Sequence, residues 1–407
     1  MRHATPWNST SPNAATVILV FGLIANLAPL LTYAVTLREI AAAWGLSAGQ
    51  SGWIGGIYFA GYAAVVPVMG SAGDRFDARR LYVASALLAA VVSCAFALWA
   101  HGFLLAMLLR FCGGVAFAGV HMPGLKLLVD RVAPARQSRA AALYSSCYAV
   151  GSAASLLVAG LADAAFGWRA AFVAGGIGPL LAIAGLTFLG AAPQRTRGAK
   201  TRLLEFRPVL RNRALMAYVA GFAGNTWEVF AVRVWFVAYL GWTLSLPGNS
   251  LRLPPLGVIA GLASLAGLPV SIVTAELAQR HGREPVIIMT CALSVAVCLG
   301  LAATAGGPAP IVMTLLILVQ ITSFADVGAL AGGAVAAADP DRRGAALAIY
   351  ALAGYSTGFL GPVAVGAALD LFGGAASPAG WRAGFLTIAL GSAAAAAAIR
   401  WAALPRS

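Results

Sequence analysis

Long apolar runs follow one another along almost the whole chain, separated by short breaks that contain glycine, proline and arginine. A helix that crosses a membrane needs about 20 consecutive apolar residues. These runs reach that length without the alternation of polar and apolar positions that marks barrel strands. The pattern predicts an all-α polytopic membrane protein with twelve transmembrane helices. The expected helices cover about 15–36, 50–70, 81–100, 103–125, 140–163, 169–190, 214–240, 255–277, 285–304, 309–336, 345–369 and 382–404.

The longest polar break, at 193–213, divides these runs into two sets of six. Short stretches recur between the sets: GWRAAF at 167–172 matches GWRAGF at 380–385, and APARQSRAAALY at 133–144 matches DPDRRGAALAIY at 339–350. The repeat predicts a duplicated unit, which suits two bundles that rock about a site between them. We therefore expect an N-terminal six-helix bundle at 1–192, a cytoplasmic linker at 193–213 and a C-terminal six-helix bundle at 214–407.

The basic residues are distributed unevenly among the breaks. If the N-terminus is cytoplasmic, and Arg400 near the end of the last run is counted with the C-terminal tail, all but six of the 27 lysines and arginines fall in the tails and the breaks on that same side. This is the positive-inside pattern, and it predicts a bacterial-type inner membrane protein with both termini in the cytoplasm. The net charge of +14 is then explained by topology, and no nucleic-acid partner is expected. We also expect the first run to be retained, because no basic cluster of a cleavable signal precedes it.

Composition adds little to suggest catalysis. The chain is 60% hydrophobic and 10% charged, and its five cysteines all lie inside apolar runs without metal-ligand spacing. The sequence contains no phosphate-binding loop, no nucleophile with a neighbouring base and no cluster of metal ligands. We expect no enzyme activity, no cofactor and no metal.

Three motifs resemble those of the major facilitator superfamily. GSAGDRFDARRL at 70–81 resembles the loop motif that follows the second helix in that family, although Asp77 stands where glycine is usual. LRFCGGVAFAG at 109–119 resembles the motif of its fourth helix, and the GWR turns are common in it. The resemblance covers the whole chain and implies two six-helix bundles related by pseudo-two-fold symmetry. The fifth run lacks the Gly-Pro pair typical of proton-driven drug antiporters, which disfavours multidrug export.

The loop motif supplies candidates for a conformational latch. The resemblance suggests that Asp74, Arg75, Arg79 and Arg80 form charge contacts across the cytoplasmic interface, since such interface contacts break when rigid bundles switch. The alternative is that these residues only anchor the loop on the cytoplasmic side. In the second half Gln279 replaces the acidic residue of the motif.

The same resemblance implies that the first, fourth, seventh and tenth runs line a central cavity. Buried polar residues avoid lipid and face paired or water-filled interiors, and they are found on these four runs. The candidate cavity residues are Asn26, Tyr33, Arg110, His121, Asn225, Glu228, Arg233, Gln320 and Asp326.

Two carboxylates and two arginines suggest specific chemistry. A charge at the centre of a lipid-facing helix costs roughly 2.5–3.5 kcal/mol on insertion scales, so Glu228 and Asp326 are candidate proton carriers, or else members of permanent salt bridges. Arg110 and Arg233 are expected at matching depths, where two guanidinium groups can clamp an anion. Alternatively, Arg110 is structural and Arg233 snorkels to the outer interface. Glu228 and Arg233 lie about 140° apart around their helix, so each must meet another helix.

His121 is either a packing residue or a proton relay. The two-bundle repeat and the charged residues on the expected cavity helices favour a secondary active transporter that works by alternating access. It is expected to be monomeric, to lie in the lipid bilayer, to couple to protons and to move a small organic solute, more readily an anion or zwitterion. The alternative is an exporter of apolar or cationic drugs or metabolites, and a third reading is a receptor or membrane enzyme without translocation.

Overall fold

The structure is a computed structural model of the chain, and it describes residues 11–133, 136–190, 206–339 and 342–403. These residues form helices and connecting turns, with no β-strand in the ranges just given. The first part of the chain contains α1 (Pro12–Asn26), α2 (Thr32–Trp44), α3 (Ala48–Arg75), α4 (Ala78–Trp99), α5 (Gly102–Val129), α6 (Gln137–Phe166) and α7 (Trp168–Thr187). The second part contains α8 (Phe206–Leu210), α9 (Arg213–Ser245), α10 (Leu256–His281), α11 (Arg283–Ala303), α12 (Ala309–Ala325), α13 (Val327–Ala337), α14 (Arg343–Leu371) and α15 (Pro378–Ala403).

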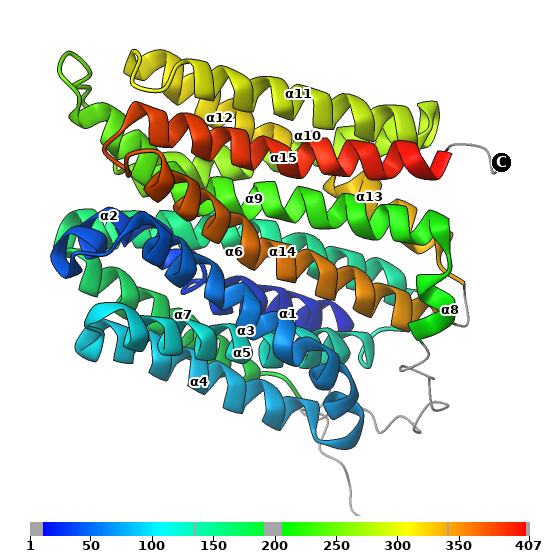
Figure 1. Cartoon of the computed structure of the whole chain (residues 1–407). Helices are drawn as coiled ribbons and strands as arrows, with labels where there is room; N and C mark the ends of the chain where they lie inside the picture. Colours follow the sequence, from blue (N-terminus) through cyan, green and yellow to red (C-terminus); the bar gives the residue numbers. More distant parts are fainter. Residues whose placement is uncertain (1–10, 134–135, 191–205, 340–341, 404–407) are drawn as a thin grey trace, which may run out of the picture.

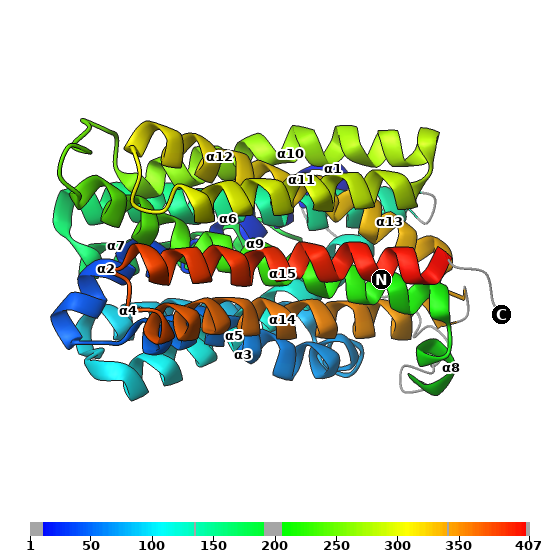
Figure 2. The ribbon, with the colours of Figure 1, turned by 45° about the horizontal axis from the view of Figure 1, so that its top comes forward.

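The long helices lie roughly parallel (Figures 1 and 2), and the two parts of the chain lie side by side in Figure 1, in contact through α3 and α14 and through α6 and α10. Here α1–α7 are called the first half and α9–α15 the second half. Ten stretches of the described residues are long and apolar enough to cross a membrane. The all-helical, multi-pass architecture is confirmed. The number of twelve spans, the pseudo-symmetry and the domain bounds at 192 and 214 stay predictions, and residues 193–205 of the expected linker lie outside the described residues.

The first expected run, 15–36, is broken in the structure. Helix α1 ends at Asn26 and α2 begins at Thr32, because Pro29 lacks a backbone N–H and disfavours a continuous helix. The backbone groups freed by the break are satisfied from other helices. The Ser155 hydroxyl accepts from the N–H of Leu31 at 2.9 Å and donates to the carbonyl of Ala28 at 2.7 Å. Irregular backbone at membrane depth requires such internal partners.

The tenth expected run, 309–336, is also interrupted. Helix α12 ends at Ala325 and α13 begins at Val327, with Asp326 between them. The amide of Asn225, on α9, donates to the carbonyl of Ser323 at 2.8 Å. A side chain that inserts into the hydrogen-bond ladder of a helix is a recognised cause of a kink, so the break at Asp326 and the buried position of Asn225 belong together.

The two halves meet closely at one end of the molecule, near the start of α3. Gly160 of α6 lies against Gly257 of α10, where an added Cβ on Gly160 would approach the Gly257 Cα to 2.8 Å. Gly52 of α3 similarly lies against the carbonyl of Pro362 on α14. Only a residue without a side chain permits this approach. We call this the closed end.

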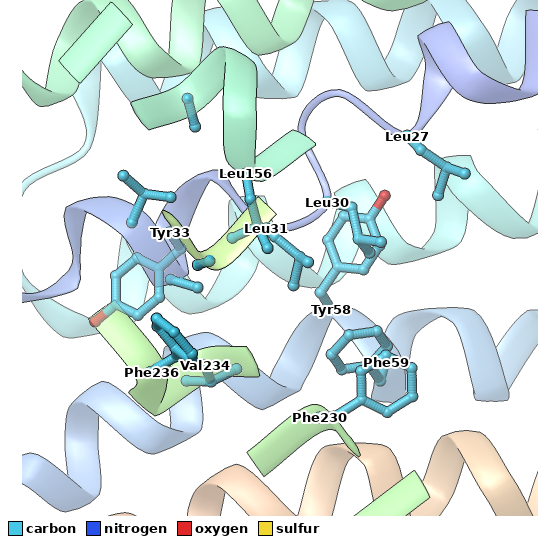
Figure 3. Close-up of a cluster of buried hydrophobic side chains, with 14 of the residues drawn as sticks. Leu27, Leu30, Leu31, Tyr33, Tyr58, Phe59, Leu156, Phe230, Val234 and Phe236 are labelled. Carbon is cyan, nitrogen blue, oxygen red and sulfur yellow. The ribbon is translucent and has the colours of Figure 1, made fainter. Parts of the chain in front are cut away.

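Toward the opposite end, α6 and α10 border a groove of about 660 Å³, lined by Ser146 of α6 and by Ser271, Glu276 and Arg280 of α10. The same helix pair therefore touches at the closed end and separates toward the other end. Between these levels, apolar side chains from both halves form a shared core. Figure 3 shows Tyr58 and Phe59 of α3 close to Phe230 of α9, with Leu30, Leu31 and Leu156 nearby.

Candidate functional site

Arg233 of α9 is the most unusual buried group in the interface between the halves. Its side chain is 1% exposed, and none of its three guanidinium nitrogens has a hydrogen-bond partner among the described residues. The guanidinium lies 4.6 Å from the ring centroid of Phe324 and 5.9 Å from that of Phe230. Burying an unpaired charge is costly, and ring faces offset only part of that cost. The side chain does not reach a helix end, so the snorkelling alternative does not apply in this structure.

Aromatic rings from both halves close the space beside Arg233. The ring centroids of Phe59 (α3) and Phe230 (α9) are 3.9 Å apart, and those of Tyr62 (α3) and Tyr355 (α14) are 4.1 Å apart. The phenol groups of Tyr148 and Tyr355 lie within electrostatic range of the guanidinium. We call Phe59, Tyr62, Phe230 and Tyr355 the aromatic layer. It separates Arg233 from the groove end of the interface, because Phe230 precedes Arg233 by one helical turn.

The side chain of Glu228 faces away from Arg233, toward α11 and α15. Its carboxylate accepts hydrogen bonds from the hydroxyls of Ser294 on α11 and Ser392 on α15. The Cys298 thiol lies 3.9 Å away. Glu228 and Arg233 were both expected to face one central cavity. The angle of about 140° between them instead directs Glu228 toward α11 and α15 and Arg233 toward Phe324 of α12, within electrostatic range of Tyr148 of the first half.

Asp326 forms a second buried carboxylate in the same half. The Asn225 amide donates to its Oδ1 at 2.7 Å, and the Cys291 thiol lies 3.5 Å from its Oδ2. Glu228 is 1% exposed and Asp326 is 4% exposed. In the described part of the chain neither carboxylate has a lysine or arginine within ion-pair distance. The permanent salt bridge considered for Glu228 is therefore absent from these residues, and both carboxylates have only neutral donors.

Two of the three guanidinium nitrogens of Arg110, on α5, donate hydrogen bonds inside the first half. Its guanidinium donates to the carbonyls of Pro29 at 3.0 Å and Leu30 at 2.8 Å, and it lies 4.6 Å from the ring centroid of Tyr58. These are the carbonyls of the break between α1 and α2. Arg110 and Arg233 therefore do not form the expected clamp in this structure, and the geometry matches the structural alternative for Arg110.

The remaining candidate residues pack within one half. Asn26 donates to the hydroxyl of Tyr82 at 2.9 Å, and Gln320 donates to the hydroxyl of Ser264 at 2.8 Å. Tyr33 is fully buried, with its ring against Phe96.

His121 is stacked between two aromatic rings and connects to the aromatic layer. Its Nδ1 is hydrogen-bonded to the Tyr62 hydroxyl at 2.8 Å, and its ring stacks on Phe117 and Tyr144. Both the packing reading and the relay reading fit these contacts.

The expected latch has a different geometry. Arg79 donates to the carbonyls of Leu186 at 2.8 Å and Leu189 at 2.9 Å. Its side chain thus caps the end of α7, which belongs to the same half. Among the described residues, Arg80 is paired at 3.8 Å with Asp77, its neighbour at the start of α4. The side chains of Asp74 and Arg75 lie outside the described residues. The contacts of Arg79 and Arg80 thus stay within the first half, because α4 and α7 belong to one bundle.

A contact between Asp370 and the start of α3, which no sequence motif indicated, does join the halves. Asp370, at the end of α14, accepts hydrogen bonds from the N–H groups of Ala48 at 2.9 Å and Gly49 at 2.8 Å and from the Ser47 hydroxyl at 2.8 Å. These donors form the N-terminus of α3, where a carboxylate is favoured. No sequence spacing could reveal this pair, because the partners lie more than 300 residues apart.

Comparisons with known proteins agree with this architecture. Residues 14–362 match the family model described as Major Facilitator Superfamily. A putative niacin/nicotinamide transporter of Bacillus subtilis is 25% identical over 264 residues, which are 60% of this chain and 61% of that protein. A niacin transporter of Acinetobacter baylyi is 31% identical over 140 residues, 33% of this chain and 30% of that protein. The chain thus matches less than two thirds of the length of these two relatives.

Other relatives are matched over more of their length. A hexuronate transporter of Bacillus subtilis is 25% identical over 369 residues, covering 85% of this chain and 86% of that protein. A bacterial homologue of the human lysosomal transporter Spinster, solved in an inward-facing and occupied conformation, has a TM-score of 0.79 at 15% identity and covers 98% of each chain. The nucleoside transporter NupG has a TM-score of 0.76 at 14% identity and covers 96% of this chain and 100% of that one.

These relatives are transporters rather than enzymes, and the solved structures share the fold. The family match extends from α1 into α14 and so includes the candidate site residues from Asn26 to Asp326. The chain belongs to the major facilitator superfamily.

Proposed function

We propose that the protein is a secondary active transporter that moves a small carboxylate by alternating access and couples this movement to protons. The observation that carries the proposal is Arg233, a fully buried guanidinium between the halves that lacks a hydrogen-bond partner among the described residues. A guanidinium fits a carboxylate through two parallel hydrogen bonds. A bound carboxylate would supply the missing negative charge.

The relatives are consistent with this substrate charge. One is named for niacin and nicotinamide, one for niacin and one for hexuronate. Nicotinic acid and hexuronates are carboxylates, whereas nicotinamide is neutral. The surroundings of Arg233 favour a compact solute with an apolar body, because Phe230 and Phe324 offer ring faces. A polyhydroxylated acid would need more polar partners to replace its hydration.

Glu228 and Asp326 are the proposed proton sites. Both are buried, and their hydrogen-bond partners in the described ranges are neutral. A buried carboxylate without a counter-ion is stable when it carries a proton. Because these groups face into the second half, we propose that protonation acts by changing how α9 packs against α11 and α15, rather than by direct contact with the substrate.

The arrangement of the halves supports alternating access. The halves touch at the closed end through Gly52 and Gly160. The aromatic layer lies on the groove side of Arg233, and α6 and α10 border the groove at the other end. We propose that the closed end is outside and the groove end faces the cytoplasm, as the positive-inside pattern suggests. Both termini would then be cytoplasmic, and a monomer in the inner membrane would suffice.

Thermal unfolding of the purified protein in detergent tests the proposal. The ligand pair is nicotinate and nicotinamide, which share a ring and differ in charge, with glucuronate as a third ligand. Binding to the folded state stabilises it by about 2.7 kcal/mol when the ligand is at 100 times its Kd. We expect a carboxylate to stabilise the wild type but not Arg233→Gln, and to stabilise the exposed control Arg169→Gln fully. Equal stabilisation of Arg233→Gln would contradict the anion site.

A second candidate function is favoured by one observation, the two acidic side chains within the second half. Under this alternative the protein exports apolar or cationic solutes, and Glu228 or Asp326 contacts the cation. A lipophilic cation such as tetraphenylphosphonium would then stabilise Arg233→Gln but not Glu228→Gln. A receptor without translocation would bind its ligand yet fail to accumulate it in sealed vesicles under a proton gradient.

A further inference from the structure

A basic pocket lies between the beginning of α1 and the beginning of α6, away from Arg233 and the aromatic layer. Its volume is about 460 Å³, and Pro12, Asn13, Val132, Ala133, Arg136 and Arg139 are among its lining residues. The side chains of Arg136 and Arg139 are exposed, and neither has a hydrogen bond or ion pair within the described ranges. The pocket thus presents two cations that no side chain in the described ranges neutralises.

The repeated sequence allows a comparison with the second half. Ala133 corresponds to Asp339, and Arg136 corresponds to Arg342. The local structure is the same: the N–H of Arg136 donates to the carbonyl of Ala133 at 2.8 Å, and that of Arg342 to the carbonyl of Asp339 at 3.0 Å, just before α6 and α14 begin.

In the second half, the arginine that corresponds to Arg136 is neutralised by a carboxylate, and a helix covers the site. Arg342 donates to the carboxylate of Asp339 at 2.8 Å. Helix α8 packs over the same place through Val209, which is 4% exposed, and the remaining cavity is only about 100 Å³. The first half has alanine where Asp339 stands, and residues 1–10, which precede α1, contain no acidic residue. The described part of the chain therefore leaves this pocket open to an anionic group from outside the protein.

The other walls of the pocket fit a lipid. Val132 and Ala140 form a buried apolar floor, and the exposed side chain of Leu143 continues along α6 from the arginines. The pocket lies where α6 begins, and the apolar stretch of α6 that is long enough to span a membrane starts at Arg139. A pocket at the start of a span is expected at the boundary between headgroups and acyl chains. Basic pockets at this depth bind anionic headgroups.

We propose that this pocket binds the phosphate of an anionic phospholipid, with Arg136 and Arg139 on the phosphate and an acyl chain along Leu143. The proposal does not depend on the identity of the transported solute. The shared chemistry is a phosphate group, so the test separates a lipid from free phosphate.

Native mass spectrometry of the purified protein would measure binding of phosphatidylglycerol, with phosphatidylcholine and inorganic phosphate as separate arms. We expect phosphatidylglycerol to bind more tightly than either, and Arg136→Gln/Arg139→Gln to weaken its binding about tenfold. The matched control is Arg207→Gln/Arg211→Gln, which removes the same charge from exposed positions in and beside α8. Equal weakening in both double variants overturns the proposal, because it indicates general surface attraction. Phosphate that binds as tightly as the lipid overturns the lipid assignment.

A second variant keeps both arginines. Ala133→Asp copies the acidic residue of the second half and should pair with Arg136 three residues later. We expect it to weaken phosphatidylglycerol binding about as much as loss of Arg136 alone, with an unchanged melting temperature in the absence of added lipid. Undiminished lipid binding in Ala133→Asp would overturn the inference, because the missing carboxylate is what distinguishes this pocket from its counterpart.

Discussion

At the scale of single residues, Arg233 and Glu228 have opposite environments on one helix. Arg233 faces aromatic rings and lacks a hydrogen-bond partner in the described part of the chain, whereas Glu228 is surrounded by hydroxyl donors. A charge that the protein itself does not pair is retained at a cost in stability. Such a cost is expected when the pairing group arrives with the substrate.

Arg233→Met should therefore stabilise the ligand-free protein. Methionine keeps much of the side-chain volume and removes an unpaired buried charge, so we expect the free energy of unfolding to rise by about 1–4 kcal/mol. Thermal or denaturant unfolding in detergent measures the change. A loss of stability would show that the guanidinium has a protein partner and would weaken the case for an anion site.

Glu228→Gln should separate transport from its proton coupling. Glutamine keeps a hydrogen-bonding side chain at the hydroxyls of Ser294 and Ser392 but cannot bind or release a proton. We expect uphill uptake into vesicles to be lost while exchange of substrate across the membrane persists and no longer depends on pH. The control is Glu276→Gln, an exposed carboxylate paired with Arg280. Uphill uptake that survives in Glu228→Gln would exclude this residue as the proton site.

At the scale of elements, two of the expected membrane helices are broken. At each break, side chains from other helices form hydrogen bonds with the backbone groups that the break leaves free. Ser155 and Arg110 satisfy the segment between α1 and α2, and Asn225 binds the end of α12. The polar side chains on neighbouring helices therefore hold the breaks in place. This explains why Arg110, a candidate substrate contact by sequence, is found on backbone carbonyls.

Ser155→Ala should destabilise the break between α1 and α2. It leaves the N–H of Leu31 without this acceptor, which costs about 1–3 kcal/mol. Ser152→Ala is the matched control, because Ser152 is equally buried on α6 and its hydroxyl, in the described part of the chain, donates to the carbonyl of Tyr148 in its own helix. Unfolding in detergent compares the two variants, and equal losses would mean that the contact with the break contributes nothing specific.

At the scale of the whole molecule, the contact between Asp370 and the start of α3 fixes the closed end. Its three hydrogen bonds join α14 of one half to α3 of the other. Arg79 and Arg80 from the expected latch stay within one half. A charged cap across the interface must break before that end can open.

Asp370→Asn should weaken the closed end. It removes the negative charge from the N-terminus of α3, which is worth about 0.3–1 kcal/mol at an exposed helix end. A cysteine at Val234, which packs against Gly55 between the halves, should then react faster with a thiol reagent in a background without native cysteines. Asp77→Asn is the control, because Asp77 caps α4 within one half. An unchanged reaction rate would show that Asp370 does not hold this end shut.

The sequence alone determined that the protein lies in a membrane and that its fold is helical. Runs of about 20 apolar residues can be stable only as membrane helices, so the multi-pass architecture could be predicted from them. Charged residues are too costly in lipid, so the burial of Glu228, Arg233 and Asp326 could be predicted as well. The direction in which each side chain points was predictable only as an angle about its own helix.

Only the tertiary structure decided which partner each buried group meets. The angle between Glu228 and Arg233 is a property of one helix, but the hydroxyls of Ser294 and Ser392 come from distant segments that no local pattern connects to α9. The same is true of Arg110 at the break after Asn26 and of Asp370 at the start of α3. Hydrophobic periodicity specifies which faces are buried, because burial depends on the type of residue. Hydrogen bonds are short and directional, so their partners follow from the packing of whole helices.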